Sequence, residues 1–138
     1  MEKYSSIQAA VYSVFNTPAY QSENITTYPQ NFQGQVDSTE YLKVFILVGK
    51  TNAIYGTSDT GAGQIIIDIF TPAGVGTGRA FEIADTLDTY FAGKVLNTSP
   101  TNGIQTSPST LVQLGIYAEN PSLYKCSYTI NFSYFGGT

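Results

Sequence analysis

The sequence predicts an α+β domain: an antiparallel or mixed β-sheet with two helices packed on one face and a C-terminal β-hairpin. Three observations support this prediction. Two segments repeat apolar residues at helical spacing, and the last strand alternates between apolar and polar residues. In addition, not every pair of consecutive strands is separated by a helix, as a fully parallel sheet would require. The length of 138 residues suits a single domain, 1–138, without an internal linker.

The first predicted helix covers residues 3–16, where Tyr4, Ile7 and Val11 recur at spacings of three and four. Together with later apolar residues they form one stripe along the helix. We expect Pro18 to end this helix, because proline lacks the amide proton that helical hydrogen bonding requires.

Two segments have the composition of central strands, residues 40–50 and 64–70. Both are rich in β-branched and aromatic residues, and their centres are apolar on both faces. A short strand is expected around residues 25–28. Residues 50–64 and 97–109 are rich in Gly, Thr, Asn and Ser, and we expect both to be long loops.

The second predicted helix covers about residues 79–95 and follows the glycine-rich stretch "PAGVGTG". Its apolar residues fall on one side, as expected for a half-buried helix. Glu82, Asp85 and Asp88 fall on the opposite side, which predicts an acidic outer face.

The chain is expected to close with a hairpin of residues 110–118 and 123–135 around the turn "ENPS". In its second strand, residues 124–134 place apolar and aromatic side chains on one face and polar side chains (Lys125, Ser127, Thr129, Asn131 and Ser133) on the other. The apolar set is Tyr124, Cys126, Tyr128, Ile130, Phe132 and Tyr134. Alternation over so many residues is typical of a strand with one buried face.

Charged residues are unusually sparse, at 12% of the chain, and the formal net charge is −4. The six cations are scattered along the sequence, whereas nucleic-acid-binding proteins gather Lys and Arg to neutralise phosphates. Neutral polar residues and eleven Tyr must therefore cover much of the surface. Protein interfaces are enriched in Tyr and depleted of Lys and Glu, so this composition is compatible with association.

The sequence carries no signal for export or for a membrane. Its first ten residues include charges of both signs and no long apolar core, unlike a signal peptide. The longest apolar run, residues 44–48, is far shorter than the roughly 20 residues that span a bilayer. Cys126 is the only cysteine, so no disulfide can form within the chain.

Known catalytic and cofactor motifs do not fit this sequence. The loop before the second helix reads G-x-G-x-G, and neither the dinucleotide fingerprint nor the P-loop motif has that spacing. The chain contains no His, which excludes His-based nucleophilic triads. Asp59 alone supplies too few carboxylates for a Ca²⁺ site. We expect no catalytic, cofactor or metal site, and we expect the glycines to provide positive φ angles for a turn.

Asp68 is the charged residue whose position is least expected, because it shares a strand face with Ile66 and Phe70 in an apolar run. A half-buried carboxylate needs a partner. Arg79, across the glycine loop, is a candidate, either within the chain or from a neighbouring subunit. Alternatively, Asp68 lies on the solvent-facing side of the sheet.

The stretch "DIFTPAGVGTGRAFEIADTLDTYF", residues 68–91, resembles the tail terminator and tail completion proteins of tailed bacteriophages, the lambda-type neck protein family. The resemblance rests on a strand ending in Asp-apolar-Phe, a Pro/Gly turn, and then "GRAFEIADTL" and a final Phe. It extends more loosely over the N-terminal helix, the central strands and the closing hairpin.

This resemblance implies a structural virion protein with no enzymatic activity and no cofactor. Subunits would form a homohexameric ring that caps the tail tube, ends tube polymerisation and joins the tail to the head-completion or neck protein. DNA would pass through the lumen without sequence-specific binding, and the protein would be assembled in the host cytoplasm without contact to a membrane.

The resemblance also implies where subunits meet. Loops 50–64 and 97–109 would become ordered on assembly. We expect Ile54, Tyr55 and Asp59 to contact a neighbouring subunit or the tail tube, with Asp68 and Arg79 as further interface candidates.

Two other functions remain open from the sequence. The chain could be a different neck or baseplate adaptor built on the same ring-forming subunit. The many Tyr also permit a carbohydrate- or surface-binding module, although the absence of Trp and the placement of several Tyr on apolar stripes disfavour it. Size-exclusion mass would separate a ring-forming protein from a monomeric binding module.

Overall fold

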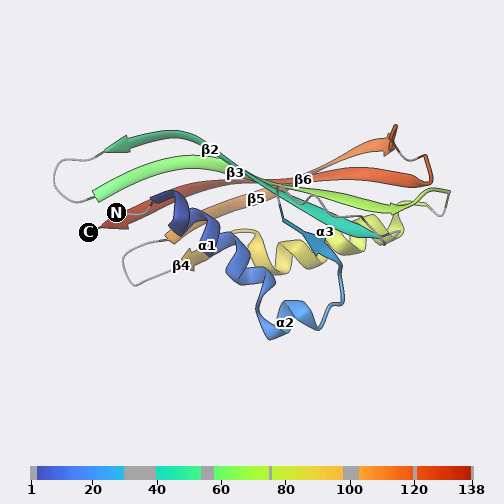
Figure 1. Cartoon of the computed structure of the whole chain (residues 1–138), viewed down its shortest axis with the longest axis horizontal. Coiled ribbons are helices and arrows are strands. Elements are labelled where there is room, and N and C mark those ends of the chain that lie inside the picture. The colour runs from blue at the N-terminus through green and yellow to red at the C-terminus, as the bar shows by residue number, and fades with distance from the viewer. Residues whose placement is uncertain are drawn as a thin grey trace.

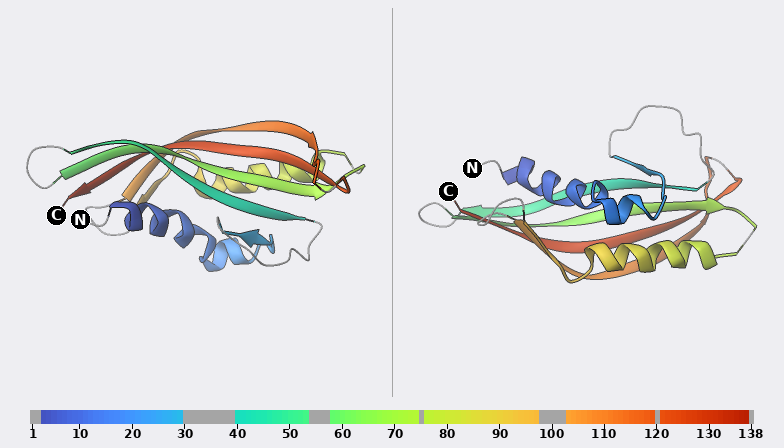
Figure 2. Two further views of the ribbon diagram at one scale, coloured as in Figure 1. Left: turned by 45° about the horizontal axis from the view of Figure 1, so that its top comes forward. Right: turned by 90° about the horizontal axis from the view of Figure 1, so that it is seen from below.

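The computed structural model describes residues 3–29, 40–53, 58–74, 76–97, 103–119 and 121–137. Within these residues the strands form one six-stranded sheet in the order β1-β2-β3-β6-β5-β4, and the helices lie on one of its faces (Figures 1 and 2). The elements are α1 (Lys3–Phe15), α2 (Pro18–Gln21), β1 (Thr27–Tyr28), β2 (Tyr41–Ala53), β3 (Ser58–Pro72), α3 (Gly78–Phe91), β4 (Val95–Asn97), β5 (Gly103–Ile116) and β6 (Leu123–Gly137).

The sheet is mixed, because β1 runs parallel to β2 whereas the other neighbouring strands are antiparallel. Its centre is the pair β3–β6, which stays in register over fifteen residue pairs, from Ser58 opposite Gly137 to Pro72 opposite Leu123. The α+β prediction, with two long helices on one face and a C-terminal hairpin, is confirmed.

The core lies between the sheet and the helices. Ile65, Ile67 and Ile69 of β3 point into it and are fully buried, as are Tyr128 and Ile130 of β6. Alternation in the two neighbouring strands therefore places one continuous apolar surface toward the helices. This arrangement confirms the side-chain direction predicted for the last strand.

Helices α1 and α3 cover that surface with the stripes expected from their sequences. α1 buries Ile7 and Val11, and α3 buries Ile83, Leu87 and Phe91. Phe15 near the end of α1 contacts Phe91 with ring centroids 5.1 Å apart, which joins the two helices above the sheet.

The second helix ends at Phe91, four residues earlier than predicted. Ala92 already has an extended backbone, and Gly93 has a φ of 63°, a left-handed conformation that ends helices. Pro18 does follow the end of α1, but it also begins the short helix α2, which the sequence did not predict. The side chain of Thr17 caps α2 by accepting a hydrogen bond from the Tyr20 amide at 3.3 Å.

The two predicted long loops are largely strand. Residues 50–53 continue β2 and residues 58–64 belong to β3, whereas residues 54–57 lie outside the described residues. In the segment 97–109, β5 begins at Gly103 instead of near residue 110. Gly and Asn have low strand propensity, but the ladders that residues 58–64 and 103–106 form with β6 override that local preference.

The glycine loop before α3 makes the turn that the sequence predicts. Gly74 and Gly76 both have a φ of 84°, which side chains with a Cβ rarely adopt. Gly78 differs, because it is the first residue of α3 and its φ is not positive.

Gly63 lies where β2, β3 and β6 approach one another closely. A Cβ atom at this position would be 2.3 Å from the Leu47 carbonyl oxygen and 2.7 Å from a ring carbon of Phe132. The carbonyl belongs to the strand backbone, so it cannot move aside without disturbing the β2–β3 pairing.

We expect Gly63→Ala to lower the free energy of unfolding by about 2 kcal/mol or more, because the added methyl group overpacks the centre of the sheet. Urea unfolding followed by circular dichroism measures the change. Gly78→Ala is the matched control, because nothing lies within 4 Å of the position that its methyl group would take and its φ is ordinary. Equal stability of the two variants would contradict this account of Gly63.

Candidate functional site

The residues predicted to form an interface are only partly described by the structure, and Asp68 and Arg79 among them do not come together. Ile54 and Tyr55 lie outside the described residues. Asp59 belongs to β3, where its backbone is paired with Ala53 on one side and Gly136 on the other. It is thus part of the sheet and not of a long loop.

Asp68 lies on the sheet face that the helices leave open, and its partner is Lys125 of the neighbouring strand β6. The Lys125 ammonium nitrogen is 3.5 Å from a carboxylate oxygen of Asp68, whose side chain is 14% exposed. The carboxylate thus lies on the open face, which is the alternative that the sequence left beside an Arg79 pair, and its partner comes from the adjacent strand.

Arg79 has different partners. It binds Glu40 through two guanidinium nitrogens, at 2.7 and 3.1 Å, and also lies 3.4 Å from Glu82 in the same helix. The hydrogen bonds with Glu40 raise the pKa of Arg79. Of the alternatives for Asp68, a pair with Arg79 within the chain is therefore not formed, because the two side chains are bound elsewhere.

The acidic face predicted for the second helix is also only partly correct. Glu82 and Asp85 are exposed, but Asp88 accepts hydrogen bonds from the hydroxyls of Tyr128, at 2.6 Å, and Ser109, at 2.5 Å. Burial, followed by the bond to this carboxylate, raises the pKa of Tyr128. Asp88 thus fastens α3 to β5 and β6.

One end of the open sheet face carries an aromatic cluster. Tyr41 and Phe70 stack with centroids 4.6 Å apart at 18°, and Tyr117 meets Phe70 edge-on at 4.9 Å. The ammonium groups of Lys43 and Lys125 lie 5.9 and 5.8 Å from the centroid of Phe70. This end of the open face is therefore a second, smaller hydrophobic core and not a fully solvent-exposed surface.

Strand β5, which forms the sheet edge beyond its short pairing with β4, exposes aliphatic side chains that were not among the predicted site residues. Val112, Leu114 and Ile116 are 48%, 54% and 58% exposed. They lie beside a β-bulge between Gln113 and Gly115, where Gly115 has a φ of 95°. The sequence did hold a sign of this exposed edge, because residues 103–116 contain none of the charged residues that usually protect an edge strand from pairing with another chain.

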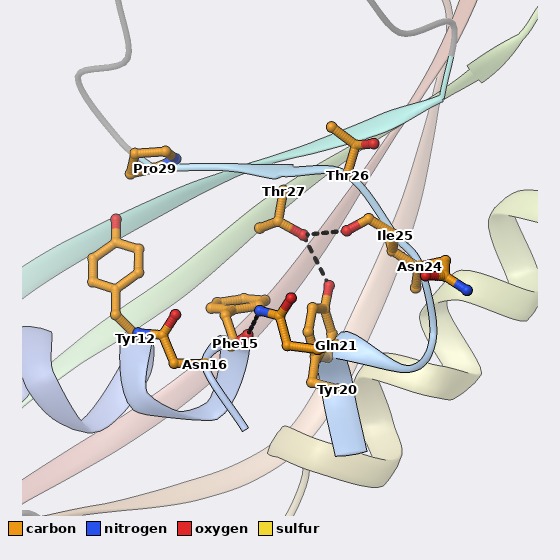
Figure 3. A pocket seen from close by; sticks show the side chains of 10 residues that line it. All are labelled: Tyr12, Phe15, Asn16, Tyr20, Gln21, Asn24, Ile25, Thr26, Thr27 and Pro29. Atoms are coloured by element: carbon orange, nitrogen blue, oxygen red, sulfur yellow. Dashed lines mark hydrogen bonds between the residues drawn. The ribbon is translucent and has the colours of Figure 1, made fainter. Parts of the chain in front are cut away.

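A cavity of about 610 Å³ lies between α1, α2 and β1 (Figure 3). Its walls combine aromatic and aliphatic groups with amides and hydroxyls, and none of the described lining residues is charged. They are Tyr12, Phe15, Asn16, Tyr20, Gln21, Asn24, Ile25, Thr26, Thr27 and Pro29. Tyr20 and Thr27 share a hydrogen bond of 3.0 Å, and the Gln21 amide donates to the Phe15 carbonyl at 2.7 Å, so these walls are held in place.

The described residues contain no group of three or more metal-ligating side chains. Cys126 is buried, and burial raises the pKa of its thiol. Among the described helices, none is long and apolar enough to cross a membrane.

Comparison with solved structures identifies the fold. The chain resembles one from a structure titled "Virion of native gene transfer agent (GTA) particle", with a TM-score of 0.70, 14% identity and coverage of 98% of both chains. The fold is that of a virion chain. A second solved structure, whose title states no function, matches with a TM-score of 0.66 and 14% identity over 92% of this chain and 94% of the other. No family model matches the sequence, and no curated protein does.

Tyr117 of the aromatic cluster also makes a hydrogen bond that can be tested. Its hydroxyl donates to Glu119 at 2.6 Å, and this bond, with burial, raises the pKa of Tyr117 from 10.0 to about 12. A pKa that is higher in the folded state contributes stability below pH 10, and that contribution is lost as the pH rises from 10 to about 12.

We expect Glu119→Ala to lower the pKa of Tyr117 toward 10.0, because the hydrogen-bonded carboxylate is its largest cause. Titration of the tyrosine ring carbons by NMR measures this value. Glu82→Ala removes a carboxylate elsewhere and should leave it unchanged. A Tyr117 pKa that stays near 12 in Glu119→Ala would rule out this assignment.

Proposed function

We propose that the chain is a structural virion protein, a tail terminator whose copies form a hexameric ring that caps the tail tube. The observation that carries this proposal is the near-complete match in fold to a chain of a gene transfer agent virion, over 98% of both chains. A match of this length concerns the whole subunit and not one shared motif.

The segment that resembles tail terminators supports the proposal independently of the fold comparison. Residues 68–91 run from the end of β3 through the glycine loop into α3. In the structure this segment joins the centre of the sheet to the helix layer, and the Arg79–Glu40 and Asp88–Tyr128 contacts hold it there. It therefore belongs to the rigid frame of the subunit.

In this role the protein acts through the shape of its surfaces. A sheet with one helix-covered face and one open face presents different sides to different neighbours. The ring would end tube growth by covering the last ring of tube subunits, and its other side would bind the head-completion or neck protein. DNA would pass through the lumen, where the net charge of −4 per chain would limit adhesion of a polyanion.

Ile54, Tyr55, Asp59, Asp68 and Arg79 remain interface predictions. The structure places Asp68 and Arg79 on separate parts of the subunit, in ion pairs with Lys125 and Glu40. Any contact that they make with a neighbour would therefore involve two surfaces and not one combined site.

Electron microscopy of tail tubes tests the proposal. We expect the purified chain, added to tubes assembled from the tail tube protein of the same virion, to form a ring of six subunits at one tube end and to stop further elongation. Tubes that continue to grow with both ends bare would contradict the proposal. Density at the opposite, baseplate-proximal end would instead identify the chain as an adaptor.

A further inference from the structure

The sheet of the subunit has two edge strands, and a short strand covers each of them over only part of its length. β4 covers the start of β5, and β1 covers the start of β2. We propose that the open stretch of β5, residues 109–116, pairs with the open stretch of β2, residues 47–53, of a second copy of this chain. The inference rests on the proposed function, because this contact is the one that would close the ring.

The outer side of β5 is occupied only at its start. β4 pairs with residues 103–105, and the backbone of residues 93–94 binds residues 106–107. From Ser109 to Ile116, the described part of the chain pairs β5 with β6 alone. The backbone amides and carbonyls on that side form a sheet edge, which is a template for pairing with another chain.

β2 is open at the other end of the sheet. The parallel strand β1 pairs with residues 42–43, whereas residues 47–53 pair, among the residues that the structure describes, only with β3. Figure 1 shows this end of β2 near the two termini and far from the end of β5. Each open stretch contains a register irregularity, at residues 48–51 and 113–115. Bulges increase the twist of a strand and are frequent at the rims of barrels.

The two edges complement each other along the strand direction. Through the registers of β3 and β6, Lys43 of β2 lies level with Val112 of β5, so the part of β2 that β1 covers is level with the open part of β5. Likewise Asn52 lies level with Gly103, so the open part of β2 is level with the part of β5 that β4 covers. Pairing the open stretches therefore moves the next copy along the strands, past both short strands. A stagger of this kind is what a sheet of tilted strands needs to close on itself.

The strand directions fit a head-to-tail contact between copies. Three antiparallel ladders separate β2 from β5, so the two strands run in opposite directions within one copy. Repetition of the subunit along its sheet places β5 antiparallel to β2 of the next copy, which is the more stable arrangement of a strand pair. Because the contact joins two different edges, it is heterologous and closes into a ring. Two β5 strands paired about a two-fold axis would instead give a dimer and leave β2 open.

The same pairing brings exposed aliphatic side chains together on the open face of the sheet. Val112 lies opposite Ser127, which lies opposite Asp68 of β3. Leu47 lies opposite Gln64 of β3, and Gln64 and Asp68 are four residues apart, so Val112 and Leu47 point to the same face. They are 48% and 49% exposed. In the joined sheet they become direct or diagonal cross-strand neighbours, and such pairs stabilise a sheet.

The helix side of the β2 edge has room for the added strand. A cavity of about 620 Å³ lies between α1 and β2, with Ile7 and Val48 among its lining residues. Leu111 lies opposite the buried Tyr128, so it points to the helix side and faces this cavity in the joined sheet. Lys50 is the only charged residue in the sequence of the β2 stretch and the β5 stretch has none, so no like charges meet along the pair.

Cross-linking tests this pairing directly. Val112→Cys and Leu47→Cys in one chain place two thiols on the open face, and the native Cys126 is buried, so a short bis-maleimide links the new pair. We expect the double variant to give covalently linked chains of up to six copies, in free solution at high concentration or on capped tubes. Each single variant should give no linked dimer. Val112→Cys with Phe81→Cys is the matched control, because Phe81 is 41% exposed on α3, outside both edges, and should give no linked chains.

Charge exchange across the contact gives a second test. Leu47→Lys with Val112→Lys places like charges beside each other, whereas Leu47→Glu with Val112→Lys places opposite charges there. We expect the first variant to need roughly tenfold more protein than the second to form rings or cap tubes. The inverted pair, Leu47→Lys with Val112→Glu, has the same net charge as the second variant and should match it. Equal ring formation by all three variants would overturn the inference.

The cross-linking outcomes separate this inference from the proposed function. Linked dimers of the Val112→Cys single variant would show two-fold pairing of β5, and capped tubes without linked chains of the double variant would show that the ring closes elsewhere. Either result overturns the inference and leaves the proposed function intact. Bare tubes with the unaltered chain overturn the proposed function. In that case linked chains in free solution support the pairing, and their absence overturns it as well.

Discussion

The pairing of β3 with β6 is the constraint on which the rest of the structure depends. It brings together two segments from the middle and the end of the chain and holds them over fifteen residue pairs. Because side chains alternate along both strands, this register places Ile67 and Tyr128 on the core side and Asp68 and Lys125 near each other on the open side. A shift by one residue would exchange the two faces.

The surfaces of the subunit follow from this frame. β5 extends the sheet on the β6 side and, beyond its short pairing with β4, forms the edge of the described sheet, where its aliphatic side chains are exposed. The α3 helix is fixed above the same strands through Asp88. On the other side of β3, the sheet continues through β2 to β1. The cavity lies there, between β1, α1 and α2. One sheet thus fixes the position of the exposed β5 side chains relative to the cavity.

The sequence predicted those parts of the fold that depend on local periodicity. The alternation in the strand before Phe135 and the apolar stripe of the helix around Ile83 can each be recognised from the sequence of that segment alone. The described parts of segments 50–64 and 97–109 are strand and not the predicted loop, because residues 58–64 and 103–106 pair with β6, which lies far along the chain, and residues 51–53 pair with β3. The partner of Asp68 and the role of Asp88 were missed for a similar reason, since both depend on side chains from other elements.

The central claim is that the chain works as a preformed block whose β3–β6 frame does not change when it associates. Hydrogen–deuterium exchange, compared between the free chain and capped tail tubes, tests this claim most directly. We predict equally strong protection of residues 65–71 and 124–130 in both states, with all new protection at the periphery of the sheet. Weak protection of these central strands in the free chain, or no gain anywhere on mixing with tubes, would contradict the account.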